Sequence, residues 1–136
     1  MASELKVDKF TGVTTAGSID VTGEGNSTTT NLQQGLAKVW VNYDSSTSAR
    51  DSFGISNFVD DGTGDYTANF SVTFANDDFA VSTGGANGSA SLTAYCLSTF
   101  DYSTTSIEMQ TFSVAASSVA RADRNVNNFS VHGDLA

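Results

Sequence analysis

Few side chains in this sequence have the chemistry for catalysis. His132 is the single histidine and Cys96 the single cysteine among 136 residues. A Ser-His-Asp triad would have to use His132, which we expect on the polar face of a final strand, and a multi-histidine metal site lacks its ligands. We interpret Cys96, within "LTAYCLSTF", as a small buried apolar side chain, and no disulfide can form within the chain. We therefore expect no enzymatic activity and no cofactor.

The acidic residues form a second group, and they lie in predicted turns. Asp pairs occur at 60–61 and 77–78, where aspartate favours the backbone geometry of a turn. In "DDGTGD", Asp60, Asp61 and Asp65 offer hard oxygens for calcium, but they do not fit the twelve-residue spacing of an EF-hand. A plain hairpin turn is the preferred interpretation, so no metal site is predicted. The paired carboxylates of a glycosidase remain an open alternative.

Trp40 has the clearest binding chemistry. It lies in "GLAKVWVNYD" (35–44), where alternation predicts a strand with apolar side chains on one face. An exposed aromatic among polar groups can stack against a sugar ring or a partner chain, whereas burial under another segment or in an intersubunit contact is the alternative. The residues on the face opposite the apolar one are Lys38, Trp40 and Asn42.

The composition excludes several classes of function. The net charge is −9 with only six Lys and Arg residues, so a phosphate-binding patch is absent and nucleic-acid binding is not expected. No apolar run approaches the roughly 20 residues that cross a bilayer, so membrane insertion is not expected. "MASELKVDKF" carries charges where a signal peptide needs an apolar run.

The strongest structural pattern is a hairpin in "SFGISNFVDDGTGDYTANFSVTF" (52–74). Apolar side chains take every other position from residue 66 to residue 74, which predicts a strand over 65–74, and "DDGTGD" predicts the turn before it. A change of phase in "SNFVDDG" predicts a bulge. A similar change in 107–116 predicts a bulge or a strand that changes sheets.

Between these strands the sequence predicts three exposed polar loops, 44–52, 82–91 and 98–106, the second because it is rich in glycine. A polar connection at "SSVARADRNVNN" is expected to hold a helical turn before a closing strand. Six to eight short strands with one apolar face indicate an all-β sandwich or a jelly-roll-like antiparallel domain over 32–136. Residues 1–31, with short alternating runs at 4–10 and 18–22, have too few apolar side chains to order themselves and are predicted to be a docking arm.

Several segments resemble a domain found in virion proteins of marine bacteriophages. They are "NLQQGLAKVWVNYD", "RDSFGISNFVDDGTGDYTANFSVTFANDDFAV" and the late aromatic strands, and the resemblance covers roughly residues 31–131. In cyanophages and related marine phages this domain typically ends the tail fibres. The opening "MASELKVDKFTG" is also similar to the start of many small phage structural proteins.

The resemblance implies a non-enzymatic virion appendage with a role in host attachment, commonly a homotrimer. Residues 1–31 would bind other virion proteins, and the loops would face a host surface glycan or protein. Asn87 and Tyr102, in two of these loops, join Trp40, Lys38 and Asn42 as candidate receptor or partner contacts. The alternatives are a capsid decoration protein that stabilises the head, a free-standing lectin, and an enzyme acting on host polysaccharide.

Overall fold

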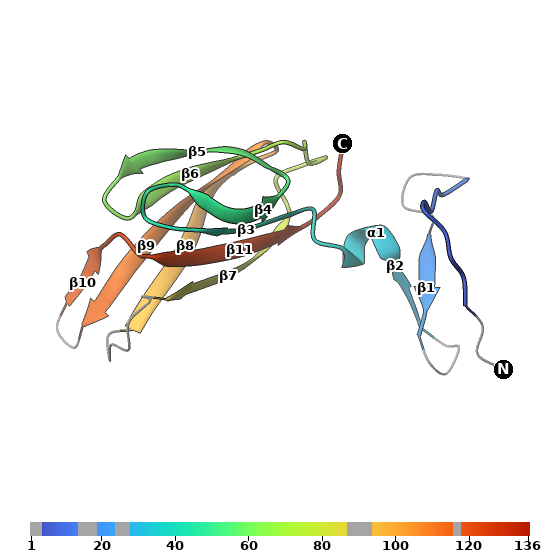
Figure 1. Cartoon of the computed structure of the whole chain (residues 1–136), viewed down its shortest axis with the longest axis horizontal. Helices are drawn as coiled ribbons and strands as arrows, with labels where there is room; N and C mark the ends of the chain where they lie inside the picture. The colour runs from blue at the N-terminus through green and yellow to red at the C-terminus, as the bar shows by residue number, and fades with distance from the viewer. Residues whose placement is uncertain (1–3, 14–18, 24–27, 87–93, 116–117) are drawn as a thin grey trace. The chain divides into compact units, whose positions relative to one another are not determined.

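The computed structural model describes residues 4–13, 19–23, 28–86, 94–115 and 118–136, except for the side chains of residues 86, 94–96 and 115. Strands dominate these residues, and the expected all-β fold is confirmed (Figure 1). The chain divides into two compact units, Met1–Leu36 and Ala37–Ala136. The boundary expected after residue 31 falls inside the first unit.

The first unit is small. It contains β1 (Asp20–Thr22), β2 (Thr29–Asn31) and the single-turn helix α1 (Leu32–Gly35). The two strands pair antiparallel, and the Asn31 side chain caps α1 by accepting a hydrogen bond from the Gln34 backbone N–H at 3.1 Å. The strand expected at 18–22 is present as β1, whereas the described residues of the run 4–10 form no strand. None of the described residues in this unit is buried.

The second unit is built from strands alone within the residues that the structure describes. In chain order they are β3 (Val39–Tyr43), β4 (Ala49–Phe53), β5 (Ile55–Gly62), β6 (Asp65–Phe70), β7 (Ala80–Ala86), β8 (Ala94–Ser103), β9 (Ser106–Ala115), β10 (Ser118–Arg121) and β11 (Val126–His132).

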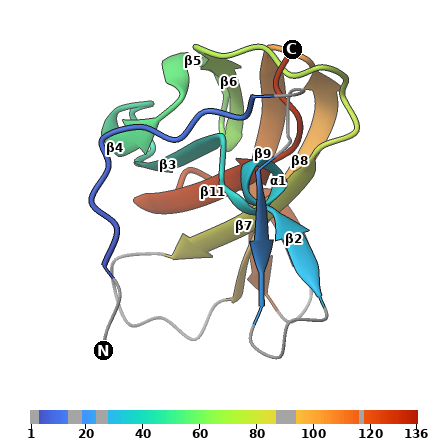
Figure 2. The same cartoon turned by 90° about the vertical axis from the view of Figure 1, so that its right-hand side faces the viewer.

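These strands form two antiparallel sheets. One has the order β4-β3-β11-β7, and its strands β3, β11 and β7 run side by side in both Figure 1 and Figure 2. The other places β9 between β6 and β8, with β5 outside β6 and β10 pairing the far half of β9. The apolar faces of the two sheets share one core, so the architecture is a β-sandwich.

The alternation predicted from the sequence decides which side chains enter that core. Tyr66, Ala68 and Phe70 on β6 are buried, as expected. The strand itself ends at Phe70, four residues earlier than predicted. Phe74 is nevertheless buried, because it forms an isolated bridge with Leu135 and packs edge-to-face on the Phe70 ring, with 5.5 Å between centroids.

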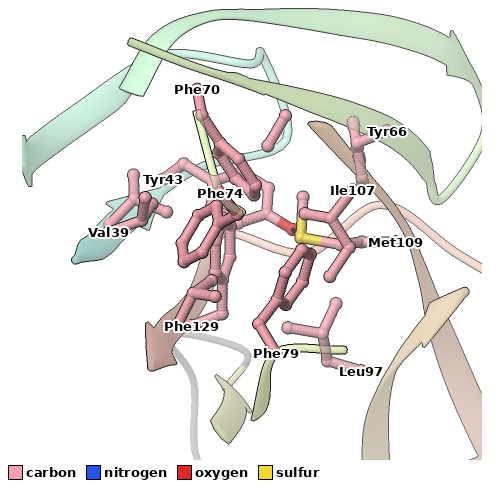
Figure 3. Packing of buried hydrophobic residues seen from close by; sticks show 13 residues of the cluster. Val39, Tyr43, Tyr66, Phe70, Phe74, Phe79, Leu97, Ile107, Met109 and Phe129 are labelled. Carbon is pink, nitrogen blue, oxygen red and sulfur yellow. Dashed lines mark hydrogen bonds between the residues drawn. The ribbon is translucent and has the colours of Figure 1, made fainter. Parts of the chain in front are cut away.

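Tyr43 lies where the two sheets meet. Its ring stacks on Phe58 at 4.8 Å and meets Tyr66 edge-on at 5.8 Å, both from the opposite sheet. Its hydroxyl donates a weak hydrogen bond to the Met109 sulfur at 3.8 Å, and burial raises the pKa of the phenol. Figure 3 shows Tyr43, Tyr66 and Met109 of this cluster together with Phe129 from β11, which also packs on the Tyr43 ring.

The two predicted phase changes have different outcomes. The bulge in β5 is confirmed, because the β5–β6 register shifts between Ile55 and Asn57 and again near Gly62. In β9 no bulge or change of sheet occurs at the change of phase after Met109; the β8–β9 register shifts earlier, where Asp101 is an extra residue of β8 opposite Ile107 and Glu108. The register of β9 with β8 is continuous from Met109 to Val114, and β9 instead exchanges one partner strand, β6, for another, β10.

The predicted loops are shorter than expected because strands occupy parts of them. Residues 49–52 belong to β4, and residues 82–86 belong to β7 despite their glycines, while 87–91 lie outside the described residues. Residues 98–103 continue β8, which leaves a two-residue turn at Thr104 and Thr105. Pairing with neighbouring strands satisfies the backbone hydrogen bonds of these polar segments, although their sequences do not predict strands.

The prediction of a helical turn in the connection before the closing strand is also wrong. Ser118–Arg121 forms β10, which pairs with the end of β9. Arg121 on β10 makes an ion pair with Asp65 on β6, at 2.6 Å between Nη1 and Oδ2. β10 therefore continues the sheet beyond Asp65, the residue at which β6 begins.

The turn between β5 and β6 is tied to the segment after β10. Gly64 has φ +65°, its N–H donates to Asp123 Oδ1 at 2.7 Å, and its carbonyl accepts from the Thr111 N–H at 2.8 Å. The Tyr66 hydroxyl donates to the same Asp123 oxygen at 2.9 Å. Burial and this hydrogen bond raise the pKa of Tyr66. One carboxylate thus joins the turn, β6 and the last connection of the chain.

Replacement of Gly64 by alanine is expected to cost more than the about 1–2 kcal/mol of a left-handed backbone. The new Cβ would lie 2.6 Å from the Thr111 carbonyl oxygen and 2.7 Å from the Ala122 nitrogen. Gly85→Ala is the control, since the nearest atom of the described residues to its Cβ would be the Val126 oxygen at 3.7 Å, and we expect a change below about 1 kcal/mol. Urea unfolding measures both, and equal losses would contradict this account of the turn.

Two buried tyrosines, Tyr43 and Tyr66, predict a contrast between matched variants. Tyr66→Phe removes a hydrogen bond to a carboxylate and is expected to lower the free energy of unfolding by about 1.5 kcal/mol. Tyr43→Phe removes only a weak bond to sulfur and is expected to cost less than about 0.5 kcal/mol. Thermal and chemical unfolding of the two variants test this order, and a larger loss for Tyr43→Phe would reverse it.

Candidate binding surface

The outer face of the β4-β3-β11-β7 sheet gathers side chains with binding chemistry. Trp40 on β3 stands opposite Phe53 on β4 and opposite Ser130 on β11. One step along the strands, Asn42 stands opposite Asp51 and Asn128. The odd-numbered neighbours Val39, Val41 and Tyr43 point inward and are buried, so the even-numbered side chains of β3 occupy the outer face.

Two large aromatic side chains are exposed side by side in register on this face. Trp40 has 38% and Phe53 has 56% of its surface accessible. Single exposed apolar residues are ordinary on proteins, but an aromatic pair on neighbouring strands forms a platform for a flat ligand or partner. Within the described part of the second unit, the other exposed large apolar residues, Val59 and Val119, are aliphatic.

An open hollow of about 320 Å³ lies beside Trp40 on the same sheet. This volume is at the lower end of the roughly 300–1,000 Å³ of small-molecule sites. None of the residues that line the hollow is charged, and its outward side chains come from three strands. They are Trp40, Asn42, Ser82, Asn128 and Ser130.

Two details of the hollow involve its asparagines. The Asn42 Oδ1 is buried and accepts no hydrogen bond, which leaves an acceptor unsatisfied. Gly84 on β7 leaves room for the Asn128 side chain, because a Cβ at residue 84 would lie 2.7 Å from Asn128 Oδ1. The Asn128 amide therefore lies across the neighbouring strand at the position where a larger residue would stand.

The structure brings together two of the five residues predicted as contacts. Trp40 and Asn42 line the hollow. Lys38 is only 7% exposed, and burial lowers the pKa of its ammonium group while the Asp134 carboxylate opposes that shift. Tyr102 is half-buried on the other sheet, packs against Phe79 at 5.2 Å and shares a 2.7 Å hydrogen bond with Thr99. Asn87 lies outside the described residues.

Sequence reasoning missed the residues that other strands contribute. Phe53, Ser82, Asn128 and Ser130 reach the surface only because β4, β11 and β7 pair in this order and register. The alternation in "NVNNFSVH" does predict which side chains of the closing strand point outward. It does not predict that this strand lies beside the one that carries Trp40.

The acidic residues considered for metal binding each have a structural partner. Asp60 accepts a bond from the Gly62 N–H at 3.0 Å, Asp61 accepts one from the Thr67 hydroxyl, and Asp65 pairs with Arg121. In the described ranges no group of three or more His, Cys, Asp or Glu side chains is placed to hold a metal ion. His132 is half-buried at the end of β11, and the side chain of Cys96 lies outside the described part of β8.

Comparisons of the chain with models of protein families, with curated protein sequences and with solved structures give no match. Among the described residues no helix is both long enough and apolar enough to cross a membrane.

Because Trp40 and Phe129 occupy opposite faces of one sheet, their truncation is expected to have unequal effects. Phe129 is 3% exposed, and Phe129→Ala should cost about 3–5 kcal/mol. Trp40→Ala should cost no more than about 1–2 kcal/mol and leave a cooperatively folded protein. Chemical unfolding followed by far-ultraviolet circular dichroism compares the two. A loss for Trp40→Ala as large as that for Phe129→Ala would place Trp40 in the core.

Proposed function

We propose that this protein is a non-enzymatic structural protein of a bacteriophage virion, a tail-fibre-like appendage that takes part in host attachment. The observation that carries the attachment role is the exposed pair Trp40 and Phe53 beside a hollow lined with amides and hydroxyls. The virion context rests on the resemblance of residues 31–131 to the terminal domain of marine phage tail fibres.

Several acidic side chains accept hydrogen bonds within turns, and this supports a structural, non-enzymatic role. Asp44 accepts bonds from the backbone and hydroxyl of Ser46, and these bonds lower the pKa of its carboxyl group. Asp60 and Asp123 likewise bind the backbone of Gly62 and Gly64. Carboxylates in such turns hold the backbone rather than face a substrate.

The first unit supports attachment to another protein. Most of its described apolar side chains are solvent-exposed, among them Leu5 by 73%, Val7 by 47%, Phe10 by 61% and Val13 by 96%. A segment whose described residues bury no side chain gains too little from their contacts to offset the entropy of ordering. We propose that residues 1–31 dock onto other virion proteins or onto further copies of the chain, as in a homotrimer, and gain their burial there.

Adsorption of virions that carry the double variant Trp40→Ala, Phe53→Ser tests this function. The platform would be lost while the core stays intact, so we expect normal particle yield. The adsorption rate constant should decrease about tenfold or more, which corresponds to about 1.4 kcal/mol of activation free energy. The control is Val59→Ser, Val119→Ser, which removes exposed apolar side chains that do not line the hollow.

Imaging of labelled particles gives the second readout. A tail-associated label together with the adsorption defect supports the proposal. Normal adsorption of the double variant would overturn the attachment role. If, in addition, the label covers the head and particles without the protein break at low salt, the protein is a capsid decoration protein.

A further inference from the structure

We propose that the hollow beside Trp40 binds a neutral saccharide, with one pyranose ring stacked on the indole. This inference rests on the proposed attachment function, because it names the ligand of that surface. It depends on three features of the described residues: the aromatic platform, the hydrogen-bonding groups around it, and the absence of charge in the lining.

The platform matches the shape of a sugar ring. A pyranose has one face of C–H groups, and an aromatic ring with its negative π-face attracts that face while both surfaces leave water. Trp40 offers a flat, part-exposed ring beside the hollow, and Phe53 stands opposite it on the next strand, about 4.8 Å away in the pairing direction. Two adjacent aromatics favour an oligosaccharide over a single monosaccharide, because a second ring can use the second aromatic.

The polar groups match the edge of a sugar ring. Sugar hydroxyls donate and accept hydrogen bonds, and so do the side chains of Asn42, Asn128, Ser82 and Ser130 that line the hollow. The Asn42 acceptor has no partner, so rotation of this amide toward a ligand hydroxyl would satisfy it at no loss of an existing bond. Gly84 leaves room for the Asn128 amide above β7.

The absence of charged side chains in the lining and the negative net charge of the chain favour a neutral ligand. None of the residues that line the hollow is charged, Asp51 stands opposite Asn42 at the edge of the sheet, and the chain has a net charge of −9. An anionic glycan would lose hydration without gaining a cationic partner and would meet a repulsive field. A second copy of the chain is a weaker candidate, since a stable interface buries about 1,200–2,000 Å² and this surface offers two exposed aromatics.

Trp40 gives a direct assay, because it is the only tryptophan in the chain. We would titrate the full chain with oligosaccharides of glucose, mannose and galactose, and with alginate oligomers as the anionic counterpart. A saturable change in tryptophan emission with a neutral series, and none with alginate, is the expected result. Calorimetry should give a millimolar or tighter dissociation constant, which corresponds to about −4 kcal/mol or better.

Three variants test whether the saccharide binds in the hollow. Asn128→Ala and Gly84→Ala, the second of which displaces the Asn128 amide, should each weaken binding about tenfold, and Trp40→Ala should abolish it in calorimetry. Val119→Ser, on β10, should bind as the unmodified chain does. Binding that none of the three site variants weakens would overturn the inference, because the saccharide would then occupy another surface.

The remaining outcomes separate this inference from the proposed function. If no neutral series binds while adsorption still depends on Trp40 and Phe53, the saccharide inference fails and the attachment function stands. If a neutral saccharide binds but adsorption is unchanged in the double variant, the attachment function fails and the binding site stands. Emission that changes with protein concentration and not with saccharide would identify the surface as a self-interface and overturn the inference.

Discussion

The packing of two sheets around Tyr43 is the constraint on which the rest of the second unit depends. The Tyr43 ring contacts Phe58 and Tyr66 across the sandwich, and the Tyr43 hydroxyl donates a hydrogen bond to the Met109 sulfur. The central strands β3, β6, β9 and β11 therefore commit one face to the core, and their outward positions are left with no packing role. The candidate binding surface consists of such outward positions, so core and surface can change independently.

The second requirement is to close the sandwich around strands of unequal length. β9 pairs with β6 along one half and with β10 along the other. Thr111 lies between the two paired halves of β9, and its hydroxyl donates to the Ala122 carbonyl at 2.6 Å. Asp123 then holds the Gly64 turn and the Tyr66 hydroxyl. A polar network thus performs at this corner the task that apolar packing performs elsewhere, and it needs a glycine because no side chain fits between Thr111 and Ala122.

The two units differ in how they gain stability. Residues 37–136 enclose a core of their own, whereas the described residues of the first unit bury no side chain. A segment of this kind is stabilised by whatever surface it meets, which is consistent with docking onto another protein. The chain thus combines a self-sufficient sandwich with a segment that needs a partner, and this combination suits a component of a larger assembly.

The sequence by itself determined the all-β class, the hairpin around "DDGTGD", the bulge in β5 and the inward and outward faces of β3. These are local properties, because side chains alternate along a strand and glycine marks the turns. It misplaced the ends of β6, β7 and β8, which depend on pairing with strands distant in sequence.

Only the tertiary structure placed Phe53, Asn128, Ser130 and Ser82 around Trp40. Strand order and register arise from the fit of two whole sheets over one core, and no short stretch of sequence carries that information.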